Sequence, residues 1–144
     1  MNYRKYSEDE LRDYGIWKET LPNIKKEIKL LEEVALPAID YSDDRVDGSS
    51  GKDNVDILLS KLMEKEHKLE TLEFIEGRME FIESALSRLN EEERYVLNSL
   101  YIEEIAKVPR ELEDEMYLSE RQIRRIRNQA LTKYTKYRVG LVEI

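Results

Sequence analysis

The segment "YLSERQIRRIRNQALTKYTKYR", residues 117–138, carries the strongest local folding signals in the sequence. Ser119 and Gln122 have the spacing of a capping box, in which each side chain bonds the backbone N–H of the other residue. Leu118 and Ile123 stand at the positions of a hydrophobic staple around that cap. The segment therefore predicts a helix that begins directly after Ser119.

The predicted helix has one buried and one exposed face. At 100° per residue, its apolar side chains fall on one side: Ile123, Ile126, Ala130, Leu131 and Tyr134. Long polar side chains point the opposite way: Arg121, Arg125, Asn128, Gln129 and Lys136. Gln122 and Arg124 flank this polar face. Arg127 falls near the apolar edge, where we expect it to pair with an acidic neighbour.

The charge of this segment contrasts with the charge of the rest of the chain. Residues 119–138 carry a net charge of +6 within a chain of 144 residues whose net charge is -8, so the other residues together carry -14. A row of cations on a helix is often only a solvated surface. An asymmetry of this size instead favours a basic tail that meets a polyanion and an acidic body that avoids it.

The elements before this helix favour DNA as the polyanion. A short helix is expected to begin at Pro109, a favourable first-turn residue, and to turn Leu112 and Met116 inward. A short helix, a tight turn and a capped basic helix form the geometry in which a recognition helix enters the major groove. We therefore expect a helix-turn-helix in the C-terminal third.

The side chains on the exposed face have the chemistry needed to contact DNA. Arginine can bond guanine, and asparagine or glutamine can bond adenine, through two hydrogen bonds each. The predicted base-reading residues are Arg121, Arg125, Asn128 and Gln129. Lys133, Lys136 and Arg138 suit phosphates, which position a protein without specifying the sequence. The DNA-binding set is predicted as Ser119, Glu120, Arg121, Gln122, Arg124, Arg125, Asn128, Gln129, Lys133 and Lys136.

The N-terminal half is expected to form acidic helices. Ser7 and Glu10 have capping-box spacing, which predicts a first helix starting at Ser7. Pro22 is expected to restart that helix and Pro37 to end it. The segment "IDYSDDRVDGSSGKDN", residues 39–54, is expected to be a loop. Its aspartates do not make a convincing calcium loop, because Arg45 and Asn54 occupy two ligand positions.

A long helix is expected over residues 55–89, with apolar residues spaced mostly by three, four or seven. Asn90 and Glu93 signal a further helix start, followed by core candidates: Tyr95, Val96, Leu97 and Leu100. The expected fold is all-α. Its parts are an acidic helical region with a loop (1–54), a long central helix (55–89) and a helix-turn-helix DNA-binding domain (90–144).

The composition argues against several other classes of protein. No run of about 18 apolar residues exists, so no membrane span is expected. The sequence has no cysteine and one histidine, His67, which lies among charged neighbours and suits a surface position. We therefore expect a cytoplasmic protein without a metal, a cofactor or enzymatic activity.

Residues 89–101, "LNEEERYVLNSLY", and 111–131, "ELEDEMYLSERQIRRIRNQAL", resemble region 4 of sigma-70 factors. The first part of that pattern matches Leu89, Glu93, Arg94, Val96 and Leu97. The second part matches Glu111, Leu112, Met116, Leu118, Ser119, Ile123, Ala130 and Leu131. Glu113 stands where alanine is usual in that family, and Tyr117 where glycine is usual. The resemblance implies a helix-turn-helix that binds promoter DNA.

The order of acidic helices, loop, long helix and basic module resembles the ArpU and RinA group of phage-encoded activators of late gene transcription. That resemblance implies a sequence-specific regulator that binds double-stranded promoter DNA and acts with bacterial RNA polymerase. The acidic helices would serve homodimerisation or polymerase contact. Two alternatives remain: a helical adaptor or structural protein whose basic tail meets an acidic partner, and a DNA-packaging recognition subunit assembled into a ring.

Overall fold

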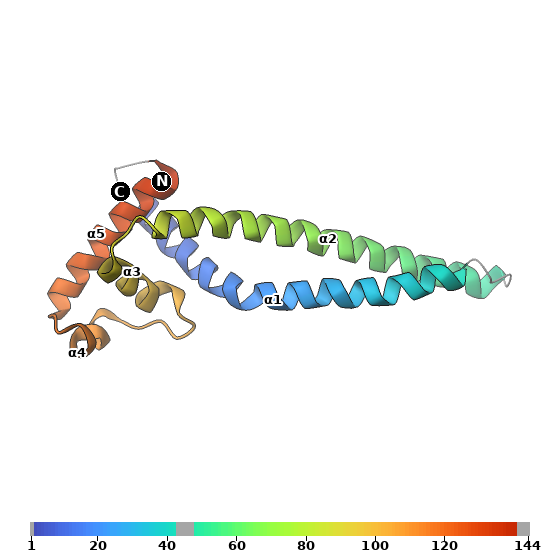
Figure 1. Cartoon of the computed structure of the whole chain (residues 1–144), viewed down its shortest axis with the longest axis horizontal. Coiled ribbons are helices and arrows are strands. Elements are labelled where there is room, and N and C mark those ends of the chain that lie inside the picture. Colours follow the sequence, from blue (N-terminus) through green and yellow to red (C-terminus); the bar gives the residue numbers. More distant parts are fainter. Residues whose placement is uncertain (1, 43–47, 141–144) are drawn as a thin grey trace. The chain divides into compact units, whose positions relative to one another are not determined.

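The computed structural model describes residues 2–42 and 48–140, and only the backbone of residues 34–42 and 48–53. All regular structure in these ranges is helical, as predicted (Figure 1). The long helices are α1 (Tyr3–Ser42) and α2 (Gly48–Leu86). The C-terminal elements are α3 (Glu91–Leu97), a π-helical turn η1 (Asn98–Ile102), a 3-10 turn η2 (Pro109–Leu112), α4 (Glu113–Met116) and α5 (Glu120–Val139).

Contacts divide the chain into two compact units that are discontinuous in sequence. Met1–Glu19 and Gly77–Ile144 form one unit, and Thr20–Glu76 forms the other. The first unit joins the start of α1 to the C-terminal elements. The linear division expected at residues 54 and 89 did not anticipate this grouping.

The unit Thr20–Glu76 is a pair of antiparallel helical segments from α1 and α2 (Figure 1). Ile28 and Ile75 are buried within it. Lys65 lies 3.4 Å from Glu32, and Lys68 donates to Glu27 at 2.5 Å. Because these four charged side chains are partly exposed, the two pairs contribute little to stability.

Helix α1 differs from the prediction at both ends and in its interior. It begins at Tyr3, where the side chain of Asn2 accepts a hydrogen bond from the backbone N–H of Lys5 at 3.1 Å. Ser7 does not cap the helix but lies buried inside it. The helix also continues through Pro22 and Pro37. Each proline removes one backbone hydrogen bond, and the cooperativity of the long helix on both sides offsets that cost.

Helix α2 is longer at its start than the predicted helix over 55–89. It begins at Gly48, so residues 39–42 and 48–54 of the predicted loop are helical. The Asp-, Ser- and Gly-rich composition of this segment disfavours a helix only weakly, and the adjoining helices outweigh that preference. Arg45 of the rejected calcium alternative lies outside the described residues. The helix ends at Leu86, and a tight turn follows in which the backbone N–H of Leu89 donates to Leu86.

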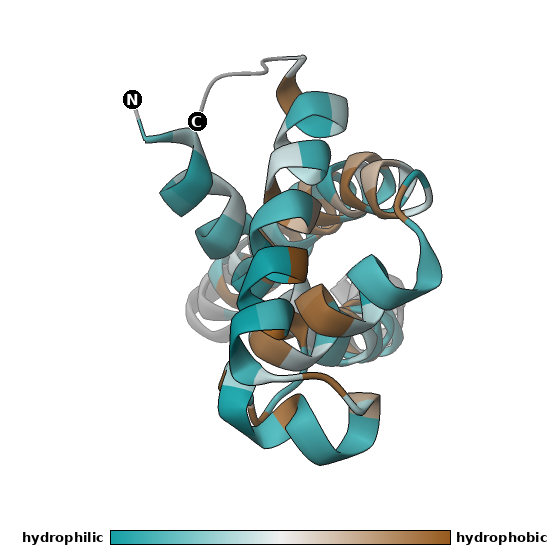
Figure 2. Ribbon diagram, turned by 90° about the vertical axis from the view of Figure 1, so that its left-hand side faces the viewer, coloured by the Kyte–Doolittle hydropathy of each residue, from teal (hydrophilic) through white to brown (hydrophobic). Residues whose placement is uncertain are grey.

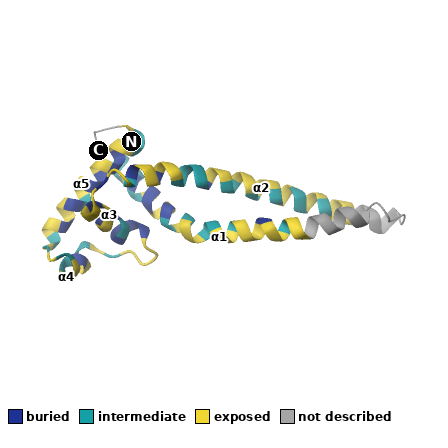
Figure 3. Cartoon of the chain, viewed as in Figure 1, coloured by how far each residue is buried: buried dark blue, intermediate teal, exposed yellow. Residues whose placement is uncertain are grey.

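The core of the first unit combines residues from α1, the end of α2 and every C-terminal element except α4. Its buried side chains include Leu11, Tyr14, Ile82, Leu97, Leu100, Leu112, Ile123, Leu131 and Tyr134. Figure 3 colours the buried positions along these elements dark blue. Helix α5 packs against α3 and η2. Val96, Leu97 and Leu100 are buried as predicted, but Tyr95 is 40% exposed. Its hydroxyl instead donates to Glu115, because its position on α3 faces α4 at the surface.

At Gly15, the backbone of α1 approaches the C-terminal elements closely. A Cβ atom on Gly15 would lie 2.1 Å from the carbonyl oxygen of Ile102 in η1. No side chain fits at this distance, so the contact requires glycine. At this point, the backbone of helix α1 packs directly against the backbone of the π-helical turn η1.

Candidate nucleic-acid interface

The start of α5 has the capping box that the sequence predicts. Ser119 has extended backbone angles (φ -73°, ψ 159°), and its Oγ accepts from the backbone N–H of Gln122 at 3.2 Å. The side chain of Gln122 accepts from the backbone N–H of Ser119 at 2.9 Å. At the other end, Gly140 takes a left-handed conformation and donates to the carbonyl of Lys136. Both ends of the helix are therefore set by local hydrogen bonds.

The two faces of α5 are confirmed. The predicted stripe of Ile123, Ile126, Ala130, Leu131 and Tyr134 is buried. The stripe also includes Thr135, which sequence reasoning missed because threonine is polar. Its hydroxyl lies 2.6 Å from that of Ser7 in α1, so burial is compensated by a hydrogen bond. Figure 2 shows that the remainder of α5 is predominantly hydrophilic.

The exposed face contains the residues predicted to contact DNA. The structure places them at the surface, with only Glu120 partly buried: Ser119, Arg121, Gln122, Arg124, Arg125, Asn128, Gln129, Lys133 and Lys136. Among the described residues, Arg121, Arg125 and Lys136 have no ion-pair partner. Arg121 and Arg125 are one helical turn apart, so their unpaired guanidinium groups lie on the same side of α5.

Other cations of α5 are already paired within the chain. Arg124 donates to Glu120 at 2.6 Å, one turn earlier in the helix. Lys133 lies 3.0 Å from the carboxylate of Glu93, which is buried at the start of α3. Glu93 was expected only as part of a capping box with Asn90, and it forms that box as well. Arg124 is thus paired within α5, and Lys133 links α5 to α3, whereas Arg121, Arg125 and Lys136 have no ion-pair partner among the described residues.

Arg127 lies at the apolar edge as predicted, but its hydrogen bonds go to a neighbour on the same helix. Its guanidinium donates to Oδ1 of Asn128 at 3.2 and 3.3 Å. A two-bond contact with adenine uses the side-chain NH2 of Asn128 as donor and its Oδ1 as acceptor, so it needs the same oxygen. Arg127 therefore occupies the oxygen of Asn128 that such a contact would need. Asn128, Gln129, Thr132 and Lys133 also line an open depression along α5.

Arg138, which the sequence suggested for phosphate contact, is turned into the protein. Only 12% of its side chain is exposed, its Nε lies 2.9 Å from Glu10, and its guanidinium lies over the ring of Phe81. The same carboxylate accepts from the hydroxyl of Tyr134, whose pKa is raised by burial and then by this hydrogen bond. Arg138 therefore anchors α5 to α1 and is excluded from the interface.

A second polar cluster holds the short helix α4 near α3. Glu115 accepts from the hydroxyl of Tyr95 and from Lys107 at 3.3 Å. These hydrogen bonds lower the pKa of Glu115 and raise the pKa of Tyr95. The cluster positions α4 just before the turn into α5.

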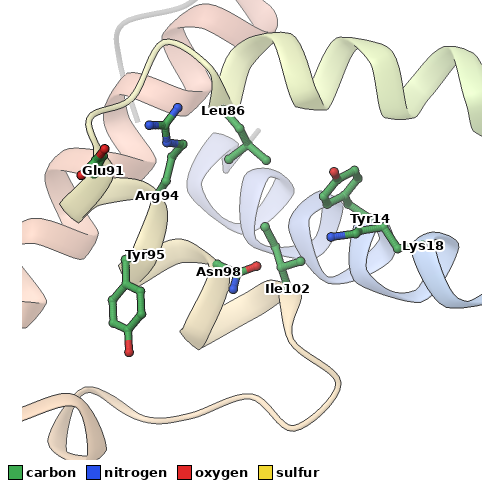
Figure 4. Close-up of a pocket in the computed structure, with 8 residues that line it drawn as sticks. All are labelled: Tyr14, Lys18, Leu86, Glu91, Arg94, Tyr95, Asn98 and Ile102. Carbon is green, nitrogen blue, oxygen red and sulfur yellow. The ribbon is translucent and has the colours of Figure 1, made fainter. Parts of the chain in front are cut away.

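A pocket of about 380 Å³ lies between α1, the end of α2, α3 and η1 (Figure 4). Leu86, Ile102 and Tyr14 supply its apolar surface, and its cations are Lys18 and Arg94. The hydroxyl of Tyr14 donates to Glu83 at 3.1 Å, and burial is the main cause that raises the pKa of Tyr14 to about 12. No residue of α5 lines this pocket.

Comparison of the chain with family models, with characterised proteins and with solved structures finds no match. Within the described residues, no group of three or more histidine, aspartate or glutamate side chains is placed to hold a metal ion. None of the helices in residues 2–42 and 48–140 combines the length and apolarity needed to cross a membrane.

Proposed function

We propose that the protein is a sequence-specific DNA-binding transcriptional regulator whose base-reading element is α5. The observation that carries the proposal is the pair Arg121 and Arg125. Both are exposed and without an ion-pair partner among the described residues, on the face opposite a buried apolar stripe. Two unpaired guanidinium groups at the start of a capped helix suit the guanine edges of a major groove.

The elements before α5 also support its proposed role as the DNA-reading helix. The segment η2–α4 is short, and Tyr117 turns the chain directly into the cap at Ser119. This order of short helix, turn and basic helix is that of a helix-turn-helix, in which the second helix enters the groove. The acidic remainder of the chain repels DNA, so approach through α5 is favoured electrostatically.

The residues of the proposed interface would act in different ways. Arg121, Arg125 and Gln129 are available for base edges, and Lys136 for a phosphate. Asn128 becomes available when Arg127 releases its side-chain oxygen. Ser119 and Gln122 hold the helix start. Glu120 and Arg124 would contact DNA only if their ion pair opened. Lys133 would contact DNA only if its ion pair with Glu93 opened.

Within this proposal, the sequence resemblance favours a phage-type activator of late gene transcription that acts with a host's bacterial RNA polymerase. The acidic helices would then mediate homodimerisation or contact with the polymerase. We also expect the protein to act by binding alone, without a catalytic step or a cofactor.

Selection of double-stranded fragments from a random DNA library, followed by gel shift, tests the proposal. The wild-type protein should enrich one motif. Arg125→Ala should weaken binding to it by about 1–3 kcal/mol, and Arg121→Ala with Arg125→Ala should weaken it further. A matched control is Lys18→Ala with Arg94→Ala, which removes the same charge from residues outside α5. It should change affinity little. No enrichment, or full affinity of the Arg121/Arg125 variant, would overturn the proposal.

A further inference from the structure

Tyr117 has a backbone conformation that is unfavourable for tyrosine. Its φ of 54° and ψ of 38° lie in the left-handed region, and among the described residues it is the only one other than glycine with a positive φ. A residue with a Cβ is disfavoured in this region, because the Cβ comes too close to the following carbonyl oxygen. Glycine or asparagine is the ordinary occupant of such a position at a helix end.

No contact of the Tyr117 side chain with another described residue offsets this cost. It is 92% exposed, more than any other large apolar side chain in the described part of the molecule. Its ring and hydroxyl make no hydrogen bond, ion pair or ring contact with another described residue. Strained, solvent-exposed residues of this kind concentrate at functional sites. No stabilising contact for Tyr117 is present among the described residues, which points to a partner outside the chain.

The position of Tyr117 identifies the surface involved. It ends α4 and stands two residues before the cap at Ser119, so at most about 7 Å of extended chain separates the two. Arg121 follows in the first turn of α5. The ring is thus held at the end of α5 where the unpaired guanidinium groups begin.

We propose that Tyr117 is an additional DNA contact, in which the ring packs against apolar atoms of the DNA and the hydroxyl donates to a phosphate. This inference rests on the proposed DNA-binding function. Aromatic and aliphatic side chains contact thymine methyl groups, and tyrosine hydroxyls are common phosphate donors. The left-handed turn would then serve to present the ring beside the base-reading arginines.

The test separates stability from binding. Tyr117→Gly relieves the backbone strain, so its Tm should rise by about 3–6 °C. The same variant should bind the selected DNA about fivefold to thirtyfold more weakly, the range that corresponds to losing about 1–2 kcal/mol. Tyr117→Asn tolerates the left-handed backbone without glycine's flexibility, and it should lose affinity equally. Tyr117→Phe keeps the ring and removes only the hydroxyl, so its loss of DNA affinity should be smaller than that of Tyr117→Gly.

Ile105→Ala is the matched control, because Ile105 is 83% exposed and lies outside α5 and its turn. It should bind DNA like the wild-type protein. If the wild-type protein binds its motif and both Tyr117→Gly and Tyr117→Asn bind equally well, only this inference is overturned. A fall in the Tm of Tyr117→Gly would contradict the strain on which it rests. If the wild-type protein selects no DNA, the proposed function fails together with this inference.

Discussion

The hydroxyl of Tyr134 donates to Oε1 of Glu10 across 2.5 Å and joins α5 to α1 over 124 residues of sequence. Glu10 is only 4% exposed, and its carboxylate also lies 2.9 Å from Arg138 and 3.5 Å from Arg78. A buried carboxylate is tolerated only when it is paired and hydrogen-bonded. These contacts satisfy Glu10 and hold α5 from the side opposite its exposed face.

Removing this carboxylate should destabilise the protein. Glu10→Ala leaves Arg138 largely buried without its counter-charge, so we expect the free energy of unfolding to fall by about 3 kcal/mol. The neighbouring Asp9→Ala is the control, because Asp9 is exposed and its pair with Arg12 contributes little. Urea denaturation followed by circular dichroism measures both. Equal effects of the two variants would refute the role assigned to Glu10.

Two glycine variants should change stability in opposite directions. Gly15→Ala places a methyl group against the backbone of Ile102, which cannot move without shifting η1, so it should cost about 1–3 kcal/mol. Gly77 lies inside α2, and no atom lies within 4 Å of the position that a methyl group on it would take. Gly77→Ala should therefore stabilise the helix by about 0.5–1 kcal/mol. Thermal unfolding of both variants checks the signs, and a neutral Gly15→Ala would contradict the close approach.

Two lysines of α5 should behave differently although both are exposed. Lys136 has no ion-pair partner among the described residues, so Lys136→Ala should reduce the salt dependence of DNA binding by about one unit of slope and leave the Tm unchanged. Lys133→Ala should instead lower stability by about 1 kcal/mol, because the buried carboxylate of Glu93 loses its counter-charge and keeps only its capping hydrogen bond to Asn90. Gel shifts at several salt concentrations and thermal melts distinguish them. Identical behaviour of the two variants would contradict this assignment.

The contribution of the Ser119 cap to stability should be measurable with a single substitution. Ser119→Ala removes the acceptor for the backbone N–H of Gln122 and should cost about 1 kcal/mol. Ser119→Thr keeps an acceptor and should cost less. Hydrogen exchange at the Gln122 amide reports the effect locally. Unchanged exchange in Ser119→Ala would show that the cap does not hold the helix start.

Local patterns were sufficient to predict α5. Its cap, its apolar stripe and the exposure of Arg121 and Arg125 all depend on residues within about four positions of one another, and all agree with the structure. The cap at Asn90 was predicted for the same reason. The capping box predicted from Ser7 and Glu10 is absent, because both side chains form long-range contacts. These two residues form hydrogen bonds to Thr135 and Tyr134 instead of capping α1.

By itself, the sequence determined that the chain is helical and which face of α5 is exposed, because helical periodicity and capping are properties of neighbouring residues. Only the tertiary structure decided which cations of α5 pair with distant parts of the chain. Lys133 and Arg138 meet Glu93 and Glu10, partners 40 and 128 positions away, and Arg121 and Arg125 meet none among the described residues. The physical reason is that an ion pair depends on distance in space, and the spacing along one helix specifies only local pairs such as Arg124 with Glu120.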